Sequence, residues 1–364
     1  MRVLVVNAGS SSVKLRLLDA DDEVTGQADL GAPSTLEPDE VRAAIDEIVG
    51  DGGIDAVGHR VVHGGETFTA AVVVDDGVRA SLDALVDLAP LHQPAALTGI
   101  DTVRKALPDV PAVACFDTAF HATMPPEATT YAVPASWRER YGVRRYGFHG
   151  LSHAYVARRA PAILGRSADL RLVSCHLGAG ASLCAISAGE SVETTMGFTP
   201  LEGLVMATRS GSIDPGLPLW LQERHGLSAA DVGTALEKES GLLGLAGTAD
   251  MREVVSRMDG GDERARLAFA VYLHHLRASI AAMAAALSGV DVVAFTGGVG
   301  EGSPAVREGA LVGLEFLGLA VNSGQNEAAR GDANVSAPGA PASVVVVTAR
   351  EDLEIAAQVR AALG

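Results

Sequence analysis

The chain has 364 residues, and at roughly 150 residues per domain this length predicts about two domains. Apolar residues make up 48% of the chain and charged residues 20%, which provides material for packed cores and excludes intrinsic disorder. The net charge of −17 excludes strong binding to nucleic acid or to an anionic membrane surface. We therefore expect no partner from either class.

Lysine is scarce, since the basic residues comprise 25 Arg and three Lys, at positions 14, 105 and 238. Cys115, Cys175 and Cys184 lie in apolar runs without C-x-x-C spacing, a pattern typical of buried thiols in a reducing compartment. The N-terminus shows no signal-peptide pattern, and the alanine-rich run 278–290 is too short to span a bilayer. These features predict a cytoplasmic protein.

The first predicted elements are two strands joined by a loop of glycine and serine. An apolar run at 3–6 leads into NAGSSS, and an alternating run at 13–18 follows, which indicates a hairpin. Further strands are predicted at 56–62 and 113–116. Helical periodicity in this half covers 41–49, 80–88, 96–106 and 154–164.

The same pattern recurs in the second half, where a strand at 170–175 runs into HLGAGAS and a strand at 183–186. Gly178 lies 169 residues after Gly9, so the spacing indicates a duplicated unit with a ligand cleft between the halves. We interpret 324–341, rich in small and polar residues, as a surface loop. The remaining predicted elements are strands at 292–295 and 344–347 and helices at 230–236, 263–287 and 351–363. Alternating strands and helices predict an α/β fold.

Three glycine-rich loops follow predicted strands. In the first, NAGSSSVK, small residues let main-chain N–H groups approach an anion, and Lys14 adds a positive charge for phosphate. An ordinary hairpin turn with an exposed Lys is the alternative, because the loop is not a Walker A motif. Similar loops at 176–182 and 295–302 favour a nucleotide whose phosphates are held from both halves.

Several charged residues occupy positions that suggest a site. Arg60 lies in an apolar strand pattern and needs an anionic partner, either an internal carboxylate or a substrate carboxylate or phosphoryl group. Arg209 is placed similarly beside a Ser-Gly loop. Asp117 follows a strand and Glu351 opens the last helix, which suits either Mg²⁺ ligands or helix-terminal charges. Seven of the ten His residues lie between positions 59 and 176, and their spacing fits no zinc site.

Eleven segments, spread over nearly the whole chain, form a pattern together. They are NAGSSSVK (7–14), GHRVVHGGE (58–66), LAPLHQP (88–94), FDTAFHATMP (116–125), RRYGFHGLSH (144–153), HLGAGAS (176–182), MGFTPLEGL (196–204), TRSGSIDPG (208–216), SGLLGLAG (240–247), DMR (250–252) and EFLG (315–318). In sequence and in order these segments resemble the acetate kinase family, of the superfamily that includes sugar kinases, heat-shock chaperone ATPases and actin.

The resemblance implies two duplicated βββαβαβα-type domains of the ribonuclease H-like, actin-like ATPase fold around an interdomain cleft. The N-terminal domain is expected at 1–118 plus 349–364, and the C-terminal domain, for nucleotide binding and dimerisation, at 119–348. The implied reaction is reversible, direct in-line phosphoryl transfer from ATP to acetate, giving ADP and acetyl phosphate. Mg²⁺, or Mn²⁺ in its place, is the implied cofactor, and a homodimer is the implied assembly.

Site roles carry over position by position. His149 and Arg209 match the residues that stabilise the transition state, and Arg60 matches the carboxylate-orienting arginine. The metal site matches Asn7, Asp117 and Glu351, and Asp117 also matches a catalytic residue. The supporting histidines of the family match His92 and His176. The acetate methyl pocket matches Val62, Leu91, Phe148 and Pro200. The nucleotide side matches Asn7, Ser10, Ser12, Lys14, His176, Gly178, Gly180, Asp250, Arg252, Gly297, Gly298 and Gly300.

Some positions depart from the family pattern. Ala179 and Gly302 each replace an Asn, and Ser212 replaces an Asp. Losing an amide at position 179 removes a side-chain donor from the phosphate loop. Two alternatives stay open: a propionate or butyrate kinase, since a methylene in an apolar pocket discriminates weakly, and a catalytically inactive nucleotide-responsive binding protein.

Overall fold

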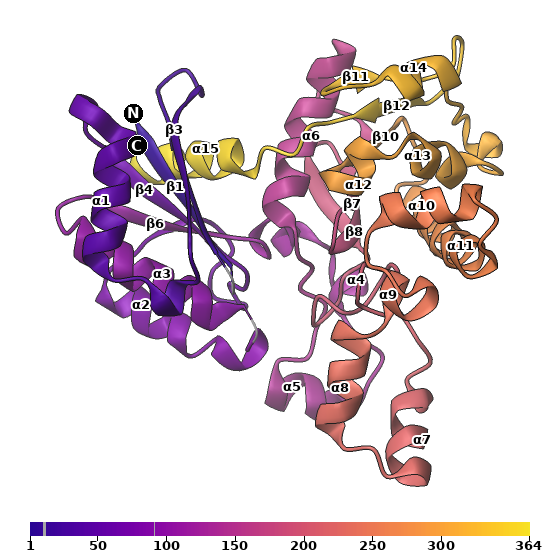
Figure 1. Ribbon diagram of the computed structural model, residues 1–364, viewed down its shortest axis with the longest axis horizontal. Coiled ribbons are helices and arrows are strands. Elements are labelled where there is room, and N and C mark those ends of the chain that lie inside the picture. Colours follow the sequence, from indigo (N-terminus) through magenta and orange to yellow (C-terminus); the bar gives the residue numbers. More distant parts are fainter. Residues whose placement is uncertain (10–11, 91) are drawn as a thin grey trace. The chain divides into compact units, whose positions relative to one another are not determined.

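The computed structural model describes residues 1–9, 12–90 and 92–364, which form two compact units (Figure 1). Unit 1 comprises 1–122, 148–155 and 350–364, and unit 2 comprises 123–147 and 156–349. Helix α6 (Gly150–Leu164) begins in unit 1 and ends in unit 2. Unit 1 therefore takes in 148–155 in addition to the segments predicted for the N-terminal domain, whose limits stay a prediction.

Unit 1 is built on a six-stranded mixed sheet with the order β3-β2-β1-β4-β6-β5. Central strand β1 pairs antiparallel with β2 and parallel with β4, so the predicted hairpin is confirmed. The strands are β1 (Val3–Ala8), β2 (Val13–Leu18), β3 (Val24–Leu30), β4 (Ala56–Val61), β5 (Val72–Val73) and β6 (Ala112–Phe116).

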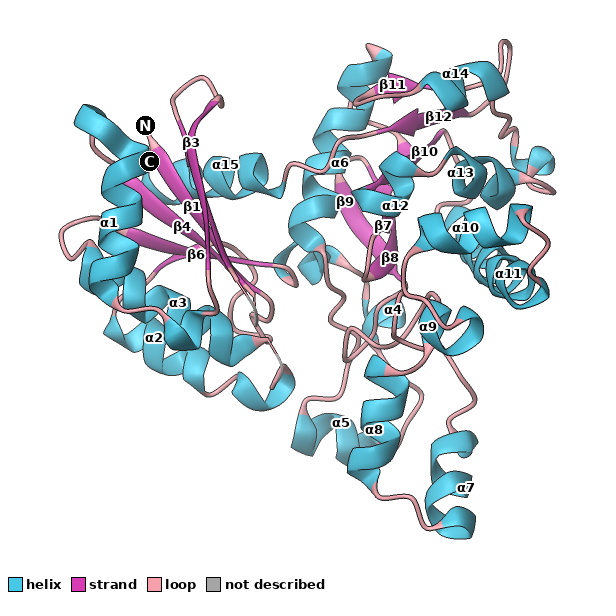
Figure 2. Cartoon of the chain, in the orientation of Figure 1, coloured by secondary structure: helices cyan, strands magenta, loops and turns pink. Residues whose placement is uncertain are grey.

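Helices cover both faces of this sheet (Figure 2). Successive residues of a strand point to opposite faces, so the apolar run of β1 supplies two cores. Leu4 and Val6 pack with helices α1 and α3, while Val3 and Val5 pack with α15. The helical segments of unit 1 are η1 (Pro33–Thr35), α1 (Pro38–Val49), η2 (Gly50–Gly52), α2 (Asp76–Asp83), η3 (Val86–Leu88), α3 (Gln93–Ala106) and α15 (Glu351–Leu363); η4 (Ala119–Thr123) runs from unit 1 into unit 2.

Unit 2 repeats this topology. Its sheet has the order β11-β12-β10-β7-β8-β9, in which β7 pairs antiparallel with β8 and parallel with β10, as β1 does with β2 and β4. The strands are β7 (Arg171–Leu177), β8 (Ala181–Ser187), β9 (Glu190–Thr194), β10 (Val292–Thr296), β11 (Ala333–Asn334) and β12 (Ser343–Val346). The predicted duplication in an α/β fold is confirmed.

The helices of unit 2 include α11 (Glu263–Ala286), which is long and apolar enough to cross a membrane by length and composition alone. It is a core helix, since Ala268, Tyr272, Leu276 and Ile280 are buried. The other helical segments are α4 (Pro126–Thr129), α5 (Ala135–Tyr141), α7 (Gly216–His225), α8 (Ala229–Lys238), α9 (Gly241–Ala246), α10 (Met251–Asp259), α12 (Gly297–Gly302), α13 (Pro304–Leu311), η5 (Glu315–Leu317) and α14 (Ser323–Ala328).

Two sequence predictions of local structure are wrong. The segment 324–341 is not wholly a loop, because it contains most of α14 and the edge strand β11. Asn322 starts α14 by accepting a hydrogen bond from the Gln325 N–H, a capping signal hidden among small polar residues. The helix predicted at 80–88 ends at Asp83 and is followed by the short η3 turn.

Candidate functional site

Three neighbouring parallel strands of unit 1 bring polar residues to one edge of the sheet. Val6 of β1 is opposite His59 of β4, and Val61 of β4 is opposite Phe116 of β6. Asn7, Arg60 and Asp117 consequently lie at or directly beyond the carboxyl ends of adjacent strands. This edge is where open α/β sheets bind ligands.

Arg60 is the centre of a charged cluster at that edge. Its Nη2 lies 2.7 Å from Asp117 Oδ2, its Nε lies 3.2 Å from both carboxylate oxygens, and its Nη1 lies 3.5 Å from Glu351 Oε2. Asp117 is 1% exposed. The internal partner that the sequence left open is therefore this pair of carboxylates, one directly after β6 and one from the first turn of α15.

Burial and charge oppose each other in this cluster. Burial alone lowers the pKa of Arg60, but the charges of Asp117 and Glu351 and the hydrogen bonds to Asp117 outweigh it and raise that pKa. Burial raises the pKa of Asp117, the Arg60 charge and hydrogen bonds lower it, and the Glu351 charge raises it further. Removing Arg60 leaves both carboxylates without a counter-charge.

His149 precedes α6 in unit 1 and has a φ of 58°, which places it in the left-handed region. On its two sides, the Phe148 carbonyl contacts His121 Nε2 at 3.0 Å and the Gly150 N–H donates to the Asp117 carbonyl at 2.8 Å. Phe148 is buried and packs edge-on against the His63 ring. Sequence reasoning assigned no role to His121 and did not predict the unusual backbone of His149.

The other residues of unit 1 that were predicted for the site differ in how exposed their side chains are. Asn7 and Ser12 are half-buried, Lys14 is exposed opposite Asn7 in the hairpin, and Val62 is half-buried. His92 is half-buried at the start of α3. Ser10 and Leu91 lie outside the described residues.

In unit 2, two glycine loops follow adjacent parallel strands. After β7 the Gly178 N–H donates to the Gly180 carbonyl, which closes a tight turn. After β10, Gly297 has a φ of 78°, and a Cβ there would lie 2.8 Å from the Leu177 carbonyl oxygen. Only glycine fits that close approach. His176 is half-buried and paired with Thr296 in the sheet register, beside both loops.

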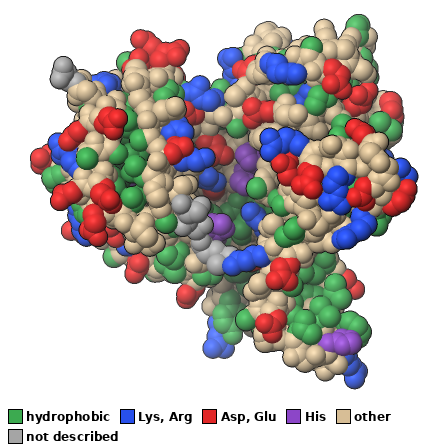
Figure 3. Space-filling view, viewed as in Figure 1, with side chains coloured by type: hydrophobic (Ala, Val, Ile, Leu, Met, Phe, Trp, Pro, Cys, Tyr) green, Lys and Arg blue, Asp and Glu red, His purple; other side chains and the backbone are tan. Residues whose placement is uncertain are grey.

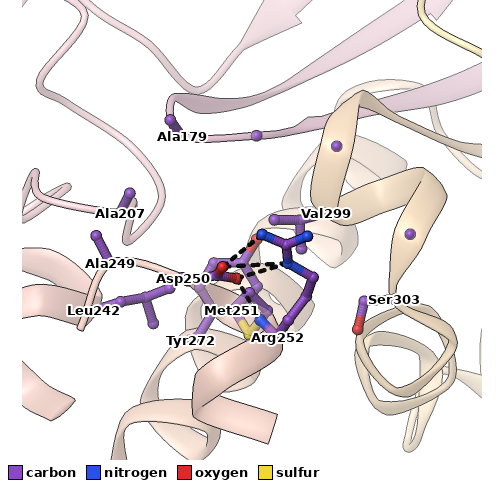
Figure 4. A pocket seen from close by; sticks show the side chains of 13 residues that line it. Ala179, Ala207, Leu242, Ala249, Asp250, Met251, Arg252, Tyr272, Val299 and Ser303 are labelled. Atoms are coloured by element: carbon purple, nitrogen blue, oxygen red, sulfur yellow. Dashed lines mark hydrogen bonds and ion pairs between the residues drawn. The ribbon is translucent and has the colours of Figure 1, made fainter.

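These loops border a pocket of about 580 Å³ within unit 2 (Figure 4). The size suits a nucleoside or nucleotide, since ligand pockets span roughly 300–1,000 Å³. Gly178, Asp250, Arg252 and Gly298 were predicted for the nucleotide, whereas sequence reasoning missed most of the wall. The lining residues are Gly178, Ala179, Ala207, Leu242, Ala249, Asp250, Met251, Arg252, Tyr272, Gly298, Val299, Gly302 and Ser303.

Polar groups of this pocket are mostly engaged within the protein. Asp250 accepts from the Arg252 N–H at the start of α10, and Arg252 Nη2 lies 2.6 Å from Asp250 Oδ2. The hydrogen bond from Arg252 lowers the pKa of Asp250 to about 2. The Tyr272 hydroxyl, on α11, is buried and has no hydrogen-bond partner among the described residues. Gly180 and Gly300 lie near this wall in sequence but do not line it.

Arg209 in unit 2 contrasts with Arg60. Its Nη1 donates to the Pro200 carbonyl at 2.7 Å, and no described carboxylate forms an ion pair with it. Burial lowers the pKa of Arg209, opposed by the charge of Glu237. A guanidinium of this kind is prepared to bind an incoming anion.

A polar network fixes the loop that carries Pro200. The Tyr131 hydroxyl accepts from the Phe198 N–H at 2.9 Å and donates to Glu202 Oε2 at 2.5 Å. Arg145 donates to Glu202 Oε1 at 2.8 Å and to the Met196 carbonyl at 3.0 Å. The sequence identified this segment only as a family match and gave no role to Tyr131 or Glu202.

Within the part of the chain that the structure describes, no group of three or more His, Cys, Asp or Glu side chains is arranged to hold a metal. Asp117 and Glu351 nevertheless converge on one guanidinium, and their hard oxygen donors are those that Mg²⁺ prefers. The amide of Asn7 lies on the adjacent strand end. The residues present fit Mg²⁺ by donor chemistry.

The model of the acetokinase family matches residues 41–357. The chain belongs to the acetokinase family. An acetate kinase from Streptomyces coelicolor is 47% identical over 98% of this chain and 96% of its own length. The acetokinase family resemblance and the enzyme class predicted from the motifs are confirmed.

Solved structures give the same family. The crystal structure of Porphyromonas gingivalis acetate kinase matches with a TM-score of 0.93 and 39% identity over 100% of both chains. A propionate kinase from Francisella tularensis matches with a TM-score of 0.91 and 32% identity over 99% of both chains. The ROK hexokinase of Thermus thermophilus, at 14% identity and a TM-score of 0.51 over 100% of this chain and 99% of its own, shares the fold alone.

Proposed function

We propose that this protein is an acetate kinase, which transfers the γ-phosphoryl group of ATP reversibly to acetate and forms ADP and acetyl phosphate. The observation that carries the proposal is the cluster of Arg60, Asp117 and Glu351 at the carboxyl edge of the first sheet, in a chain of the acetokinase family. A protein that only binds nucleotide needs no arginine placed to hold a substrate carboxylate. The inactive binding protein is therefore the weaker reading.

Direct in-line transfer demands little covalent work from the protein, so catalysis depends on placing two anions and stabilising charge on the moving group. Arg60 orients the acetate carboxylate in this proposal. His149 and Arg209 donate to the equatorial oxygens of the phosphoryl group. Each donor of this kind contributes a factor of about 10² to 10³ to turnover.

Asp117 and Glu351, with Asn7, are the residues proposed to hold Mg²⁺, or Mn²⁺ in its place. When bound, the ion neutralises negative charge on the phosphate oxygens of the nucleotide. The arginine between the two carboxylates reduces their mutual repulsion before the ion binds. Asp117 and Glu351 are thereby kept close together in the protein alone.

The pocket of unit 2 is the proposed binding site for the nucleotide. The glycine loops at 178–180 and 297–300 offer main-chain N–H groups to phosphates, and Ala207, Leu242 and Met251 offer apolar contacts to the base. His176, beside both loops, is a proposed further contact of the phosphates. From unit 1 the proposed phosphate contacts are Asn7, Ser10, Ser12 and Lys14. Asp250 and Arg252 stay proposed contacts of the nucleoside.

The proposed contacts of the acetate methyl group are Val62, Leu91, Phe148 and Pro200. Propionate kinase is the second candidate, favoured by the likeness to the Francisella tularensis enzyme. One added methylene changes binding in an apolar pocket by only about 1–3 kcal/mol, so acids of two to four carbons compete.

A homodimer in the cytoplasm is also proposed. Helix α7 of unit 2 has no buried residue and exposes Leu217, Leu219 and Trp220, and hydrophobic side chains gather at this end of unit 2 in Figure 3. Exposed apolar residues grouped on one helix are typical of an interface between protein chains. A second copy of unit 2 is the proposed occupant.

The decisive assay incubates purified protein with ATP, Mg²⁺ or Mn²⁺ and acetate, propionate or butyrate, and traps acyl phosphate as the hydroxamate. We expect metal-dependent acetyl hydroxamate, with a higher kcat/KM for acetate than for the longer acids. A higher value for propionate supports the second candidate. Failure to form any acyl hydroxamate would refute both kinases.

A further inference from the structure

His149 is held in a backbone conformation that residues other than glycine rarely adopt. Its φ of 58° brings the Cβ close to the following carbonyl group, and such residues persist where the surrounding structure fixes them. The side chain direction of His149 follows from this backbone. Whatever fixes the two adjacent peptides therefore also sets the direction of the imidazole.

The segment 117–121 forms hydrogen bonds with the main chain on both sides of His149. The Asp117 carbonyl accepts from the Gly150 N–H at 2.8 Å, and four residues later His121 Nε2 lies 3.0 Å from the Phe148 carbonyl oxygen. A carbonyl oxygen only accepts, so Nε2 of His121 carries the hydrogen and donates it. Residues 117–121 thus contact the peptides before and after His149.

Close packing leaves this loop little freedom. A Cβ on Gly150 would lie 2.2 Å from the Asp117 carbonyl oxygen, and the Phe148 ring is 1% exposed against the His63 ring. The His149 carbonyl itself accepts from the His153 N–H at 3.0 Å, which starts α6. Among these contacts, the hydrogen bond from His121 is the one made by a side chain to the main chain beside His149.

We propose that His121 is a positioning residue for phosphoryl transfer, which aims His149 through the Phe148 carbonyl without touching the substrate. The inference rests on the proposed function for its effect on turnover. It rests on the described contacts alone for its effect on His149. A displacement of a reacting group by about 1 Å costs up to about a hundredfold in rate, so a single distant hydrogen bond is sufficient to matter.

The first test compares His121→Phe, which keeps an aromatic ring without the donor, with His121→Gln, whose amide can donate from a similar reach. We expect His121→Phe to lower kcat by about ten- to a hundredfold with little change in the KM of acetate or ATP. His121→Gln should retain turnover close to wild type. In a His149→Ala background, His121→Phe should cause no further loss, because its effect acts through His149.

The second test needs no substrate. The ¹³C–¹H signal of the His149 ring, assigned by its loss in His149→Ala, should shift or broaden in His121→Phe and keep its position in His121→Gln. His59→Phe is the matched control, since His59 is a buried histidine of unit 1 with no hydrogen bond to the loop 148–150. If His121→Phe fails to fold by circular dichroism, His121→Asn, too short to reach Phe148, replaces it.

An unchanged His149 signal in the donor-less variant would overturn the proposal, as would an equal kcat loss in His121→Gln and His121→Phe. Further loss of turnover in the His149→Ala background would also contradict it. A wild-type protein that makes no acyl phosphate would refute the proposed function instead. The ring signal would still decide the role of His121 in that case.

Discussion

Arg60 and Arg209 are the same residue type in two opposite electrostatic settings. Arg60 in unit 1 is shared by Asp117 and Glu351, and this cluster carries a formal net charge of −1. Arg209 in unit 2 is held by a main-chain carbonyl and has no ion-paired carboxylate among the described residues, which leaves a charge of +1. The two carboxylates beside Arg60 therefore offer oxygen ligands to a cation, whereas Arg209 offers its positive charge to an anion.

The largest effect is expected for Arg209→Gln. Because the guanidinium has no partner whose loss would leave a buried charge, we expect kcat to fall by about 10² to 10³ while Tm changes little. Steady-state kinetics and thermal denaturation measure the two quantities. Arg266→Gln, at an exposed ion pair of α11, is the control. A wild-type kcat in Arg209→Gln would contradict the proposal that Arg209 binds the transferred phosphoryl group.

Arg60→Ala should lose most activity and, unlike Arg209→Gln, should also lower stability. Asp117 is buried, and leaving it without a counter-charge costs up to about 3 kcal/mol. Adding Asp117→Asn should restore much of the Tm but not the activity, because the uncompensated charge disappears while the clamp stays absent. Equal Tm losses in Arg60→Ala and Arg209→Gln would contradict the different electrostatic settings of the two arginines.

A smaller effect is expected for Ala179→Asn, which returns an amide to the exposed phosphate loop of unit 2. One recovered hydrogen bond is worth about 1 kcal/mol, or about fivefold in kcat/KM for ATP. Ala249→Asn, exposed on another wall of the same pocket, should give no gain. A loss of activity in Ala179→Asn would instead mean that nucleotide binding in this protein requires a small side chain at position 179.

The smallest effect on turnover is expected for Leu219→Asp on α7. A charge in an apolar interface opposes association, so light scattering should show a shift from dimer towards monomer with kcat per chain little changed. Leu267→Asp, equally exposed on α11, should leave the molar mass unchanged. A monomeric wild-type protein would contradict the proposed assembly outright.

Local pattern predicted much of the fold and less of the site. Apolar runs such as Val3–Val6 and the repeated glycine loops indicated the strands and the duplication, because both depend on neighbours in sequence. The partners of Arg60 were left open because β4, β6 and α15 meet only through long-range pairing. Tyr272 and His121 were missed for the same reason. The φ of His149 has no sequence signature for a residue that is not glycine.

The arrangement of unit 1 also has a consequence for how the protein is made. Val3 and Val5 are synthesised about 350 residues before their packing partners Ile355 and Val359. The core on that face of the first sheet stays incomplete until α15 is made, while unit 2, whose last residue is 349, can fold before it. Glu351 arrives with the same helix that covers this face. The same helix thus completes the first core and brings in the second carboxylate, so a chain that lacks α15 acquires neither.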